Sequence, residues 1–404
     1  MRGTYGDVLS LPGAAAFSLT GLVARFPLSM AALGIVLLVT ERPGGTYASA
    51  SLISGCYIAA AAALAPVQGR LGDRWGQRWV LLGTGAGFAV GMTALLVAVT
   101  QDLATPWPHL FAMVAGVFTP QAGSFARARW TWLLRDRRER LTTAFAIEAV
   151  LDEVVFVVGP VLVTVLTLQV ADVAGLAAAT TAATLGSWAL ALQTATEPGR
   201  SAGSAGPRPA MRWDVLGPVL VAAVGIGVLF GSSEIIVVAF TEEQGRKSLS
   251  GVVLAVWAAG SLAAGVVVGA LPPPADSVAR LRWTVLVLAL SFAPLMVAPD
   301  VWWLTAGMFV AGVMISPTMI AATTVVEQYV PPSRLTEALT WTSTGLAVGV
   351  APGAVLAGWV VDTHGASAGF AVPLAAGLVA AVVAWSFRPP AVPDRGLVTD
   401  AAAH

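Results

Sequence analysis

Long runs of apolar residues, separated by short polar segments, dominate the hydropathy pattern of this chain. Crossing the roughly 30 Å apolar core of a bilayer takes about 20 residues of helix. Helices are predicted because a chain in lipid must satisfy its own backbone hydrogen-bonding groups. The ninth of the twelve runs is the shortest. The predicted spans are 14–40, 46–68, 79–100, 107–128, 142–166, 172–196, 214–240, 250–271, 283–298, 302–324, 338–361 and 367–387.

The composition supports lipid as the main surroundings of the chain. Of the 404 residues, 57% are hydrophobic and only 11% are charged, against about 25% charged residues in soluble domains. The 22 basic residues balance 22 acidic ones, so no basic excess favours nucleic acid. The single cysteine, Cys56, excludes an internal disulfide. A cytosolic enzyme, a secreted disulfide scaffold and a nucleic-acid-binding protein are therefore excluded.

Basic residues gather in alternate loops, and this sets the expected orientation. Eighteen of the 22 fall on the side that also carries both termini, and Arg25 lies inside the first span. The other side carries only Arg42, Arg246 and Lys247. The positive-inside rule then places both termini in the cytoplasm of a multi-pass protein of the cell (inner) membrane. The first run lacks a convincing cleavage site, which favours a retained helix over a signal peptide.

The two halves of the chain repeat each other. The sequence VAGV at 114–117, with Pro120 after it, recurs at 310–313 with Pro317 after it. Thr40-Glu41 recurs as Thr241-Glu242, and Arg140-Leu141-Thr142 recurs as Arg334-Leu335-Thr336. The chain is therefore predicted to be an all-α membrane protein with 12 transmembrane helices in two six-helix, pseudo-symmetric bundles. The predicted parts are an N-terminal bundle (1–197), a cytoplasmic linker (198–213), a C-terminal bundle (214–390) and a tail (391–404).

The loop between the second and third predicted spans reads GRLGDRWGQR over residues 69–78. It resembles the signature G-x-L-x-D-R-x-G-R-R of the major facilitator superfamily, and departs from it at Gln77, where the signature has a basic residue. The resemblance extends to the twelve spans, the repeat and the central linker. It implies that the loop latches the cytoplasmic side by charge pairs and by a carboxylate at the N-terminus of helix 11. The residues implied in this gate are Gly69, Asp73, Arg74, Gly76 and Arg78.

The corresponding loop of the second half keeps Gly269-Ala270-Leu271 and then reads Pro272-Pro273-Pro274 without the acid. The sequence therefore predicts a latch on one side only. A second resemblance, to drug/proton antiporters, is partial. Gly159-Pro160 matches part of their helix 5 motif without its flanking glycines, and the arginine common in the middle of their helix 4 is absent, because Arg127 and Arg129 fall at the cytoplasmic end of the span.

Ionisable residues inside predicted spans are costly in lipid and are candidates for function. Arg25 and Asp152 are each about 10 residues into their helices, close to mid-depth. Glu148 and Asp152 are four residues apart and share a helix face, so they are expected to titrate as a coupled pair. Because one cation cannot neutralise all the acids, we expect one or more of them to carry a proton at neutral pH. The expected proton-coupling network is Arg25, Glu148, Asp152, Glu153 and Glu234.

Structural alternatives remain open for these residues. Glu148 is one and a half turns inside its span and also has Arg74 or Arg78 as a potential partner in the latch. Arg25 with Asp152 or Glu153 is compatible with an ion pair that holds helices 1 and 5 together. Glu234 has no obvious basic partner in its half, and a hydrogen-bonded structural acid is as compatible with the sequence as a substrate or proton site.

Further pathway residues follow from the geometry of the family, in which helices 1, 4, 7 and 10 face the cavity. Gln121 beside Pro120 and Ser316 beside Pro317 lie at matched kinks, which free backbone carbonyls. Trp257 and Trp341 lie in mid-span, where packing is favoured over stacking on a substrate. The tryptophans near span ends are expected to be interface anchors: Trp107, Trp130, Trp302, Trp303 and Trp385.

Other energy sources and chemistries have no support in the sequence. The only lysine, Lys247, does not follow a glycine-rich run, so no P-loop for ATP exists. The three histidines, His109, His364 and His404, form no metal-binding motif. We therefore expect neither an enzyme nor a bound cofactor or metal.

The sequence favours a monomeric secondary transporter whose partners are a small-molecule substrate, protons and the lipid bilayer. Export of a small amphipathic compound coupled to protons is the favoured activity. The alternatives are metabolite uptake by proton symport or facilitated diffusion, and a non-transporting membrane scaffold or sensor on the same fold. Two bundles in parallel repeat suit a central pathway that opens to each side in turn.

Overall fold

The computed structural model describes residues 2–137, 140–199, 212–269, 276–330 and 335–388, and every regular element in these ranges is a helix. The π-helix η2 (Leu166–Val170) extends α8. The helices of the N-terminal half are α1 (Arg2–Leu9), α2 (Ala14–Arg25), α3 (Pro27–Thr40), α4 (Tyr47–Trp75), α5 (Gln77–Thr100), α6 (Trp107–Val117), α7 (Ala122–Leu133), α8 (Leu141–Val165) and α9 (Ala174–Leu192).

The C-terminal half repeats this arrangement. Short 3-10 turns, η4 (Lys247–Leu249) and η5 (Ala293–Val297), adjoin α11 and α12. Its helices are α10 (Trp213–Glu243), α11 (Ser250–Gly269), α12 (Ser277–Leu290), α13 (Val301–Val313), α14 (Ile315–Tyr329), α15 (Leu335–His364), α16 (Ala366–Gly369) and α17 (Ala371–Ser386).

The twelve predicted spans are present. Eleven helical segments of the described chain are long and apolar enough to cross a membrane. The remaining span, predicted at 107–128, is formed by α6 and α7, which are each too short alone and are separated by residues 118–121. Several helices extend past the predicted ends, since α4 continues to Trp75 and α12 already begins at Ser277. Hydropathy marks the apolar core, whereas a helix continues into the polar layer.

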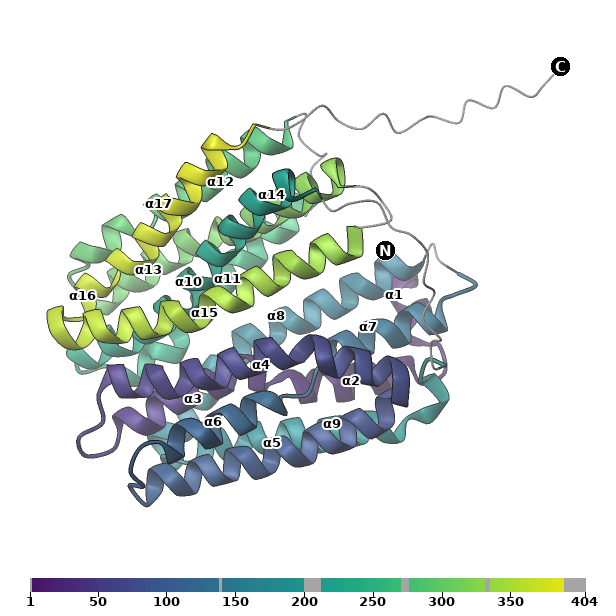
Figure 1. Cartoon of the computed structure of the whole chain (residues 1–404), viewed down its shortest axis with the longest axis horizontal. Helices are drawn as coiled ribbons and strands as arrows, with labels where there is room; N and C mark the ends of the chain where they lie inside the picture. The colour runs from purple at the N-terminus through teal and green to yellow at the C-terminus, as the bar shows by residue number, and fades with distance from the viewer. Residues whose placement is uncertain (1, 138–139, 200–211, 270–275, 331–334, 389–404) are drawn as a thin grey trace.

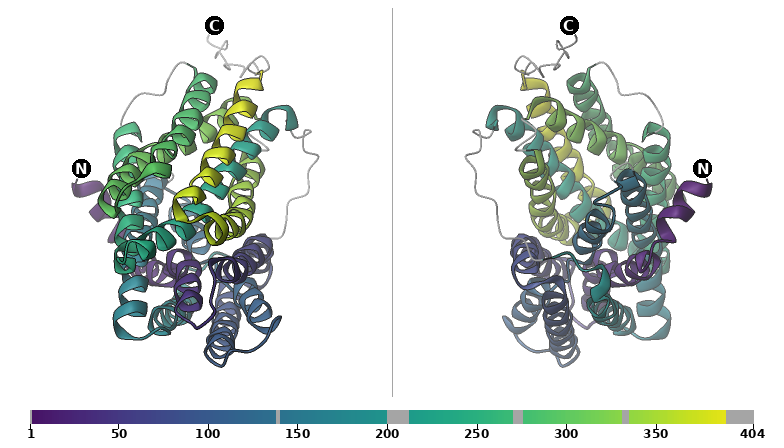
Figure 2. Two further views of the ribbon diagram at one scale, coloured as in Figure 1. Left: turned by 90° about the vertical axis from the view of Figure 1, so that its left-hand side faces the viewer. Right: turned by 90° about the vertical axis from the view of Figure 1, so that its right-hand side faces the viewer.

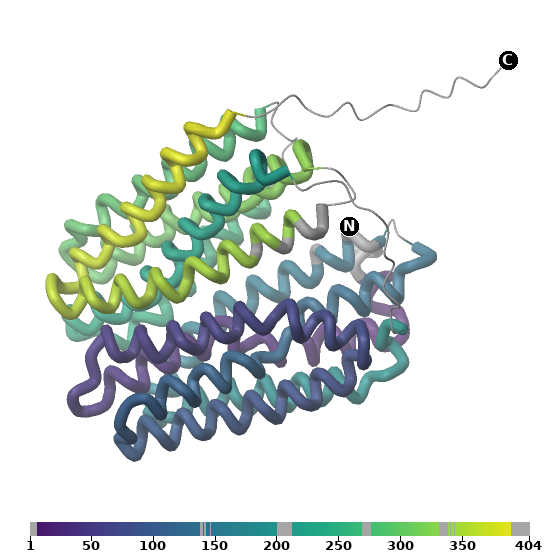
Figure 3. Tube along the Cα trace, in the orientation of Figure 1, coloured from purple at the N-terminus to yellow at the C-terminus, as the bar shows by residue number. Residues whose placement is uncertain are grey.

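The helices form two bundles, one from each half of the chain (Figures 1 and 2). One end of the molecule carries the first and last described residues, Arg2 and Arg388, and the helix ends near Arg70, Arg135 and Arg280 (Figure 1). We call it the arginine-rich end. The distal end is the other one, with the connections at 41–46, 101–106, 171–173, 244–246 and 298–300. The tube trace in Figure 3 shows α4 and α15 side by side, one from each bundle.

The repeated VAGV sequence has the same structural role in both halves. A Cβ on Gly116 of α6 would overlap the Tyr57 carbonyl of α4, and a Cβ on Gly312 of α13 would overlap the Trp257 carbonyl of α11. Only glycine allows the backbones to approach this closely. The fourth span thus packs on the second just as the tenth packs on the eighth, which supports the duplicated unit inferred from the sequence.

The two halves meet mainly through α4 against α15 and α8 against α11. Gly358 of α15 packs against the Ser51 side chain, and a Cβ on Gly55 would lie 3.3 Å from Val355. Apolar side chains from both halves, from Met30 to Phe370, form one continuous buried cluster. Small residues therefore bring the halves together along α4 and α15.

Candidate functional site

A cluster of charged side chains links α2, α7 and α8 inside the N-terminal half. Pro27 begins α3, so α2 ends at Arg25, whose side chain is only 1% exposed. Its guanidinium forms ion pairs with the Glu148 carboxylate and, at 3.0 Å, with Asp152. Because Glu148 and Asp152 are one turn apart on α8, both reach the same cation. The pairing of Arg25 with Asp152, one of the alternatives left open by the sequence, is thus present.

Arg127 supplies a second cation that the sequence reasoning did not assign to this cluster. Its guanidinium lies 2.5 Å from the second oxygen of Asp152, and its side chain is 40% exposed. Gly123 leaves the space for both guanidinium groups, since a Cβ there would lie 3.2 Å from Arg25 Nε. The expectation that acids outnumber a lone guanidinium must therefore be corrected: two arginines meet two carboxylates here.

Glu148 is fully buried and has three partners. Besides Arg25, its Oε1 accepts hydrogen bonds from Ser18 Oγ and Trp130 Nε1, each at 2.8 Å. The alternative pairing of Glu148 with Arg74 or Arg78 is absent from the described contacts. Trp130 is also not an interface anchor, because it is completely buried and packs edge-on against Phe17. A buried carboxylate draws this indole inward as a donor.

Two of the predicted acids have no such partners. Among the described residues, neither Glu153 on α8 nor Glu234 on α10 takes part in a hydrogen bond or ion pair. Glu234 lies about two thirds of the way along the 31-residue helix α10 and is followed by a run of buried apolar residues, 235–240. Like Glu153, Glu234 therefore has no counter-charge among its described contacts.

The break between α6 and α7 lies at the predicted kink of helix 4. Gln68 of α4 donates to the Val117 and Thr119 carbonyls at 2.9 and 3.1 Å, and Thr119 Oγ1 donates to Tyr57 Oη at 3.2 Å. Gln121 Nε2 also donates to the Thr119 carbonyl. Sequence reasoning missed Gln68, although an amide at the end of an apolar run, directly before Gly69 of the gate motif, was a visible signal. These donors satisfy carbonyls that the break between α6 and α7 leaves without helical partners.

The matching region of the second half differs in detail. Only Met314 separates α13 from α14, and the Ser316 hydroxyl pairs with Ser261 of α11 at 2.8 Å. The two predicted kinks therefore lie at matching positions, but the helix is interrupted over four residues in the first half and over one in the second. Trp257 is buried against Phe230, at 5.0 Å between ring centroids, and its Nε1 has no hydrogen-bond partner.

Trp341 is 40% exposed and packs edge-on against Trp213, near the arginine-rich end of the C-terminal bundle. Trp341 therefore lies near the beginning of α15, whereas the sequence predicted a position in mid-span. Trp107, Trp302, Trp303 and Trp385 are exposed near helix ends, as expected of interface residues.

The gate motif forms the turn from α4 to α5 at the arginine-rich end. Gly76 has φ of 96°, a conformation that favours glycine. Arg129, completely buried, donates from Nε to Gln77 Oε1 at 2.9 Å. The position at which the sequence departs from the family signature is thus an acceptor for an arginine of helix 4. The Arg78 backbone N–H donates to Glu197, which ties the motif to the end of the sixth span.

The latch implied for this motif is not engaged in the described part of the structure. Gly69 has open space around it, and Asp73 and Arg74 form no hydrogen bond or ion pair with another described residue. The Arg78 guanidinium stacks over Trp79 at 5.3 Å. The second-half loop, beyond Gly269, lies outside the described residues.

A second polar cluster, not anticipated from the sequence, joins the two halves at the distal end. Lys247 bridges Glu41 of one half and Glu242 of the other, at 2.7 and 3.2 Å. The Tyr47 hydroxyl also donates to Glu242. Asp362 accepts hydrogen bonds from the backbone N–H groups of Tyr47 and Ala48, at 3.1 and 2.6 Å. The repeat of Thr40-Glu41 as Thr241-Glu242 was a signal for this site, because it places an acid at the same end of each half, and Glu242 is close to Lys247 in the sequence.

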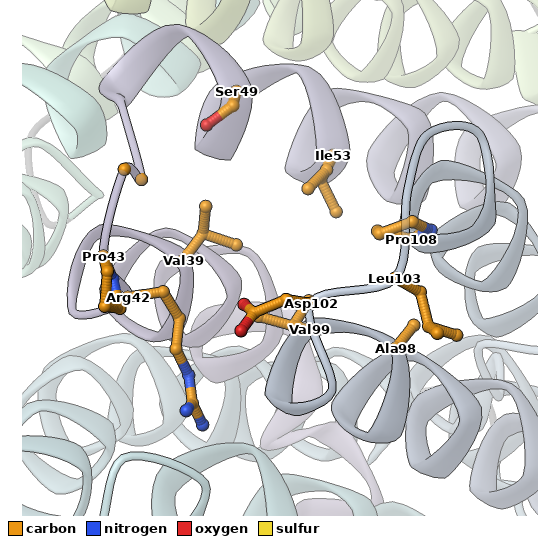
Figure 4. A pocket seen from close by; sticks show the side chains of 12 residues that line it. Val39, Arg42, Pro43, Ser49, Ile53, Ala98, Val99, Asp102, Leu103 and Pro108 are labelled. Atoms are coloured by element: carbon orange, nitrogen blue, oxygen red, sulfur yellow. The ribbon is translucent and has the colours of Figure 1, made fainter.

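Two surface cavities contain none of the predicted pathway residues. One, of about 250 Å³, lies at the distal end of the N-terminal bundle beside Arg42, Asp102 and Pro108 (Figure 4). The other lies beside Arg78, Trp79 and Glu197 at the arginine-rich end. In the described chain, no group of three or more His, Cys, Asp or Glu side chains is arranged to hold a metal ion.

Twelve spans in two six-helix bundles that meet along α4 and α15 define a membrane transporter of the two-bundle class. The family model described as Major Facilitator Superfamily matches residues 17–299 and 219–403. The chain belongs to this superfamily, as the gate motif and the repeat indicated.

Several solved structures share the fold at low sequence identity. A mutant of the nucleoside transporter NupG has a TM-score of 0.73 at 12% identity, covering 93% of this chain and 98% of that one. A peptide transporter POT in complex with sulfate has a TM-score of 0.72 at 12% identity, with 92% and 93% covered. A bacterial metal transporter has a TM-score of 0.61 at 16% identity, with 93% and 98% covered. Among curated proteins, none matches the sequence.

Proposed function

We propose that this transporter exports a small amphipathic molecule in exchange for protons, by alternating access. The observation that carries the proposal is Glu234, a carboxyl group inside a membrane span with no hydrogen bond or ion pair to another described residue. An ionised carboxylate without a counter-ion is costly in such surroundings. Either a proton or a cationic group of the substrate removes this cost, and competition between the two couples their movements.

The cluster of the N-terminal half has a different role in this proposal. Arg25 and Arg127 balance Glu148 and Asp152, so the cluster holds α2, α7 and α8 together as one rigid unit. Asp152 and Arg127 are 27% and 40% exposed, which leaves this pair accessible from outside the core. We propose that Asp152 exchanges partners during the cycle while Glu148 stays paired.

The bias of basic residues supports placing the arginine-rich end in the cytoplasm of the cell membrane. We propose that the distal end, where Lys247 and Asp362 join the halves, faces outward and is closed in this state. We propose that one chain is the transporting unit and that no ATP, cofactor or nucleic acid takes part.

Vesicles that contain the purified full-length protein test this function. Nucleosides, short peptides and small amphipathic amines are loaded, and their release is followed with and without an imposed pH gradient. Release that responds to the gradient in the parent, and not in Glu234→Gln, supports the proposal. Asp172→Asn, which changes an acid of the distal end outside this pathway, is the control.

The other outcomes separate the alternatives. Transport that persists after collapse of the pH and voltage gradients indicates facilitated diffusion, and accumulation driven by inward proton flow indicates symport. A scaffold or sensor moves none of these compounds and tolerates joint neutralisation of Arg25, Asp152 and Glu234.

A further inference from the structure

The N-terminus of α4 is completed by a residue of the other half of the molecule. The first N–H groups of a helix have no partner within it. Thr46 Oγ1 accepts from the Ser49 N–H, and the Thr46 carbonyl accepts from the Ala50 N–H. The N–H groups of Tyr47 and Ala48 both donate to Asp362 of α15.

Charge strengthens this contact. A carboxylate at a helix N-terminus accepts charge-assisted hydrogen bonds and interacts favourably with the helix dipole. Each oxygen of Asp362 accepts one of the two bonds, so the carboxylate spans the end of α4. The contact exists only while α15 lies against α4 at the distal end, where Gly358 packs on Ser51.

Neighbouring side chains extend the contact to a third helix. Tyr47 binds Asp362 through its backbone and Glu242 of α10 through its hydroxyl. Lys247 joins Glu242 to Glu41 across the halves. Opening the distal end breaks the contacts of Tyr47 with Asp362 and Glu242 and the ion pair of Lys247 with Glu41, because each of these joins the two halves.

We propose that Asp362, with Tyr47, Glu41, Glu242 and Lys247, forms a lock that closes the distal end of the transporter. The inference rests on the alternating access of the proposed function. Asp362 lies two residues before the end of α15, as Asp73 lies two residues before the end of α4. The two helices run side by side in opposite directions (Figure 3), and Asp362 lies at the N-terminal end of α4. The lock at the distal end is engaged here, whereas Asp73 has no hydrogen bond or ion pair among the described residues.

Accessibility of a reporter cysteine tests the lock without any substrate. Ser51 is fully buried at the interface of α4 and α15. In a Cys56→Ser background, Ser51→Cys is exposed to a water-soluble maleimide in vesicles of the full-length protein. Asp362→Asn is expected to raise the labelling rate about tenfold, because the hydrogen bonds of a charged acceptor are lost only from the closed state. An unchanged rate would overturn the proposal.

A matched control separates the lock from general loosening of the distal end. Asp172 pairs with Arg42 at 2.7 Å within the N-terminal half, so Asp172→Asn is expected to leave the labelling rate unchanged. Equal acceleration in both variants contradicts a specific lock. Asp73→Asn is expected to slow labelling, and the double variant Asp73→Asn/Asp362→Asn to return toward the parent rate.

A further variant covers the case in which Asp362→Asn does not yield folded protein. Tyr47→Phe removes only the hydroxyl that binds Glu242 and is expected to raise the labelling rate severalfold. No change in this variant also contradicts the lock. The lock and the proposed function can fail separately, because cysteine labelling needs no substrate. If Asp362→Asn leaves the labelling rate unchanged while the parent protein transports substrate in response to a pH gradient, only the lock is refuted.

Discussion

Arg127 lies 2.5 Å from Asp152, so two guanidinium groups, and not one, meet the buried carboxylates of α8. The arrangement divides the acids of the membrane core into two kinds. Glu148 and Asp152 have cationic partners, whereas Glu153 and Glu234 have none among the described residues. Each kind responds differently to neutralisation, and this difference can be measured.

Neutralising Glu148 is expected to destabilise the protein strongly. Glu148→Gln leaves the buried Arg25 without its full counter-charge, and loss of one partner of a buried pair costs about 3–5 kcal/mol. Replacing both residues by apolar ones, as in Arg25→Met/Glu148→Leu, is expected to recover much of this loss. Thermal unfolding of the detergent-solubilised full chain measures these changes in stability. If the double variant is destabilised by the sum of Arg25→Met and Glu148→Leu measured singly, the pairing is refuted.

Neutralising Glu234 is expected to change transport and to leave stability intact, in contrast to Glu148→Gln. Because Glu234 has no partner to lose, Glu234→Gln should leave the unfolding temperature unchanged or raise it, while transport loses its dependence on the pH gradient. The comparison with Glu148→Gln uses the same chemical change at a paired site. A marked loss of stability in Glu234→Gln would show that the carboxylate has a structural partner.

Gln77 is expected to be required as an acceptor for Arg129. Restoring the basic residue of the family signature, Gln77→Arg, places two guanidinium groups together and removes the acceptor at 2.9 Å. A loss of about 2 kcal/mol in unfolding free energy is expected. Gln77→Glu keeps an acceptor and adds a counter-charge for Arg129, but it loses the donation from Nε2 to the Phe125 carbonyl at 3.3 Å, so it should lose less stability than Gln77→Arg. Unchanged stability in Gln77→Arg would contradict the role of this contact.

The glycines of the repeated VAGV sequence are expected to be intolerant of any side chain. Gly116→Ala and Gly312→Ala place a methyl group against a carbonyl of the neighbouring helix, and overpacking costs about 1–3 kcal/mol. Gly83 of α5 has open space around it, so Gly83→Ala is the matched control and should have little effect. Equal stability of all three variants in thermal unfolding would argue against the close approach.

The fold could be predicted from the sequence, because the apolar runs, the bias of arginines between loops and the repeat can all be recognised without knowledge of contacts between helices. The charged cluster was accessible only in part. Helical spacing brought Glu148 and Asp152 to one face, but Arg127 could not be assigned, since the break at 118–121 changes the course of the fourth span. Tyr47, Glu242, Lys247 and Asp362 were missed because their contacts join helices of different halves, and hydropathy gives no information about such pairs.

The most direct test of the central claim is proton movement in vesicles that contain either the parent protein or Glu234→Gln. With a transported compound added on one side, the parent is expected to move protons in the direction opposite to the compound. Glu234→Gln is expected to move the compound, if at all, without protons. Equal proton movement by the parent and by Glu234→Gln would contradict the claim.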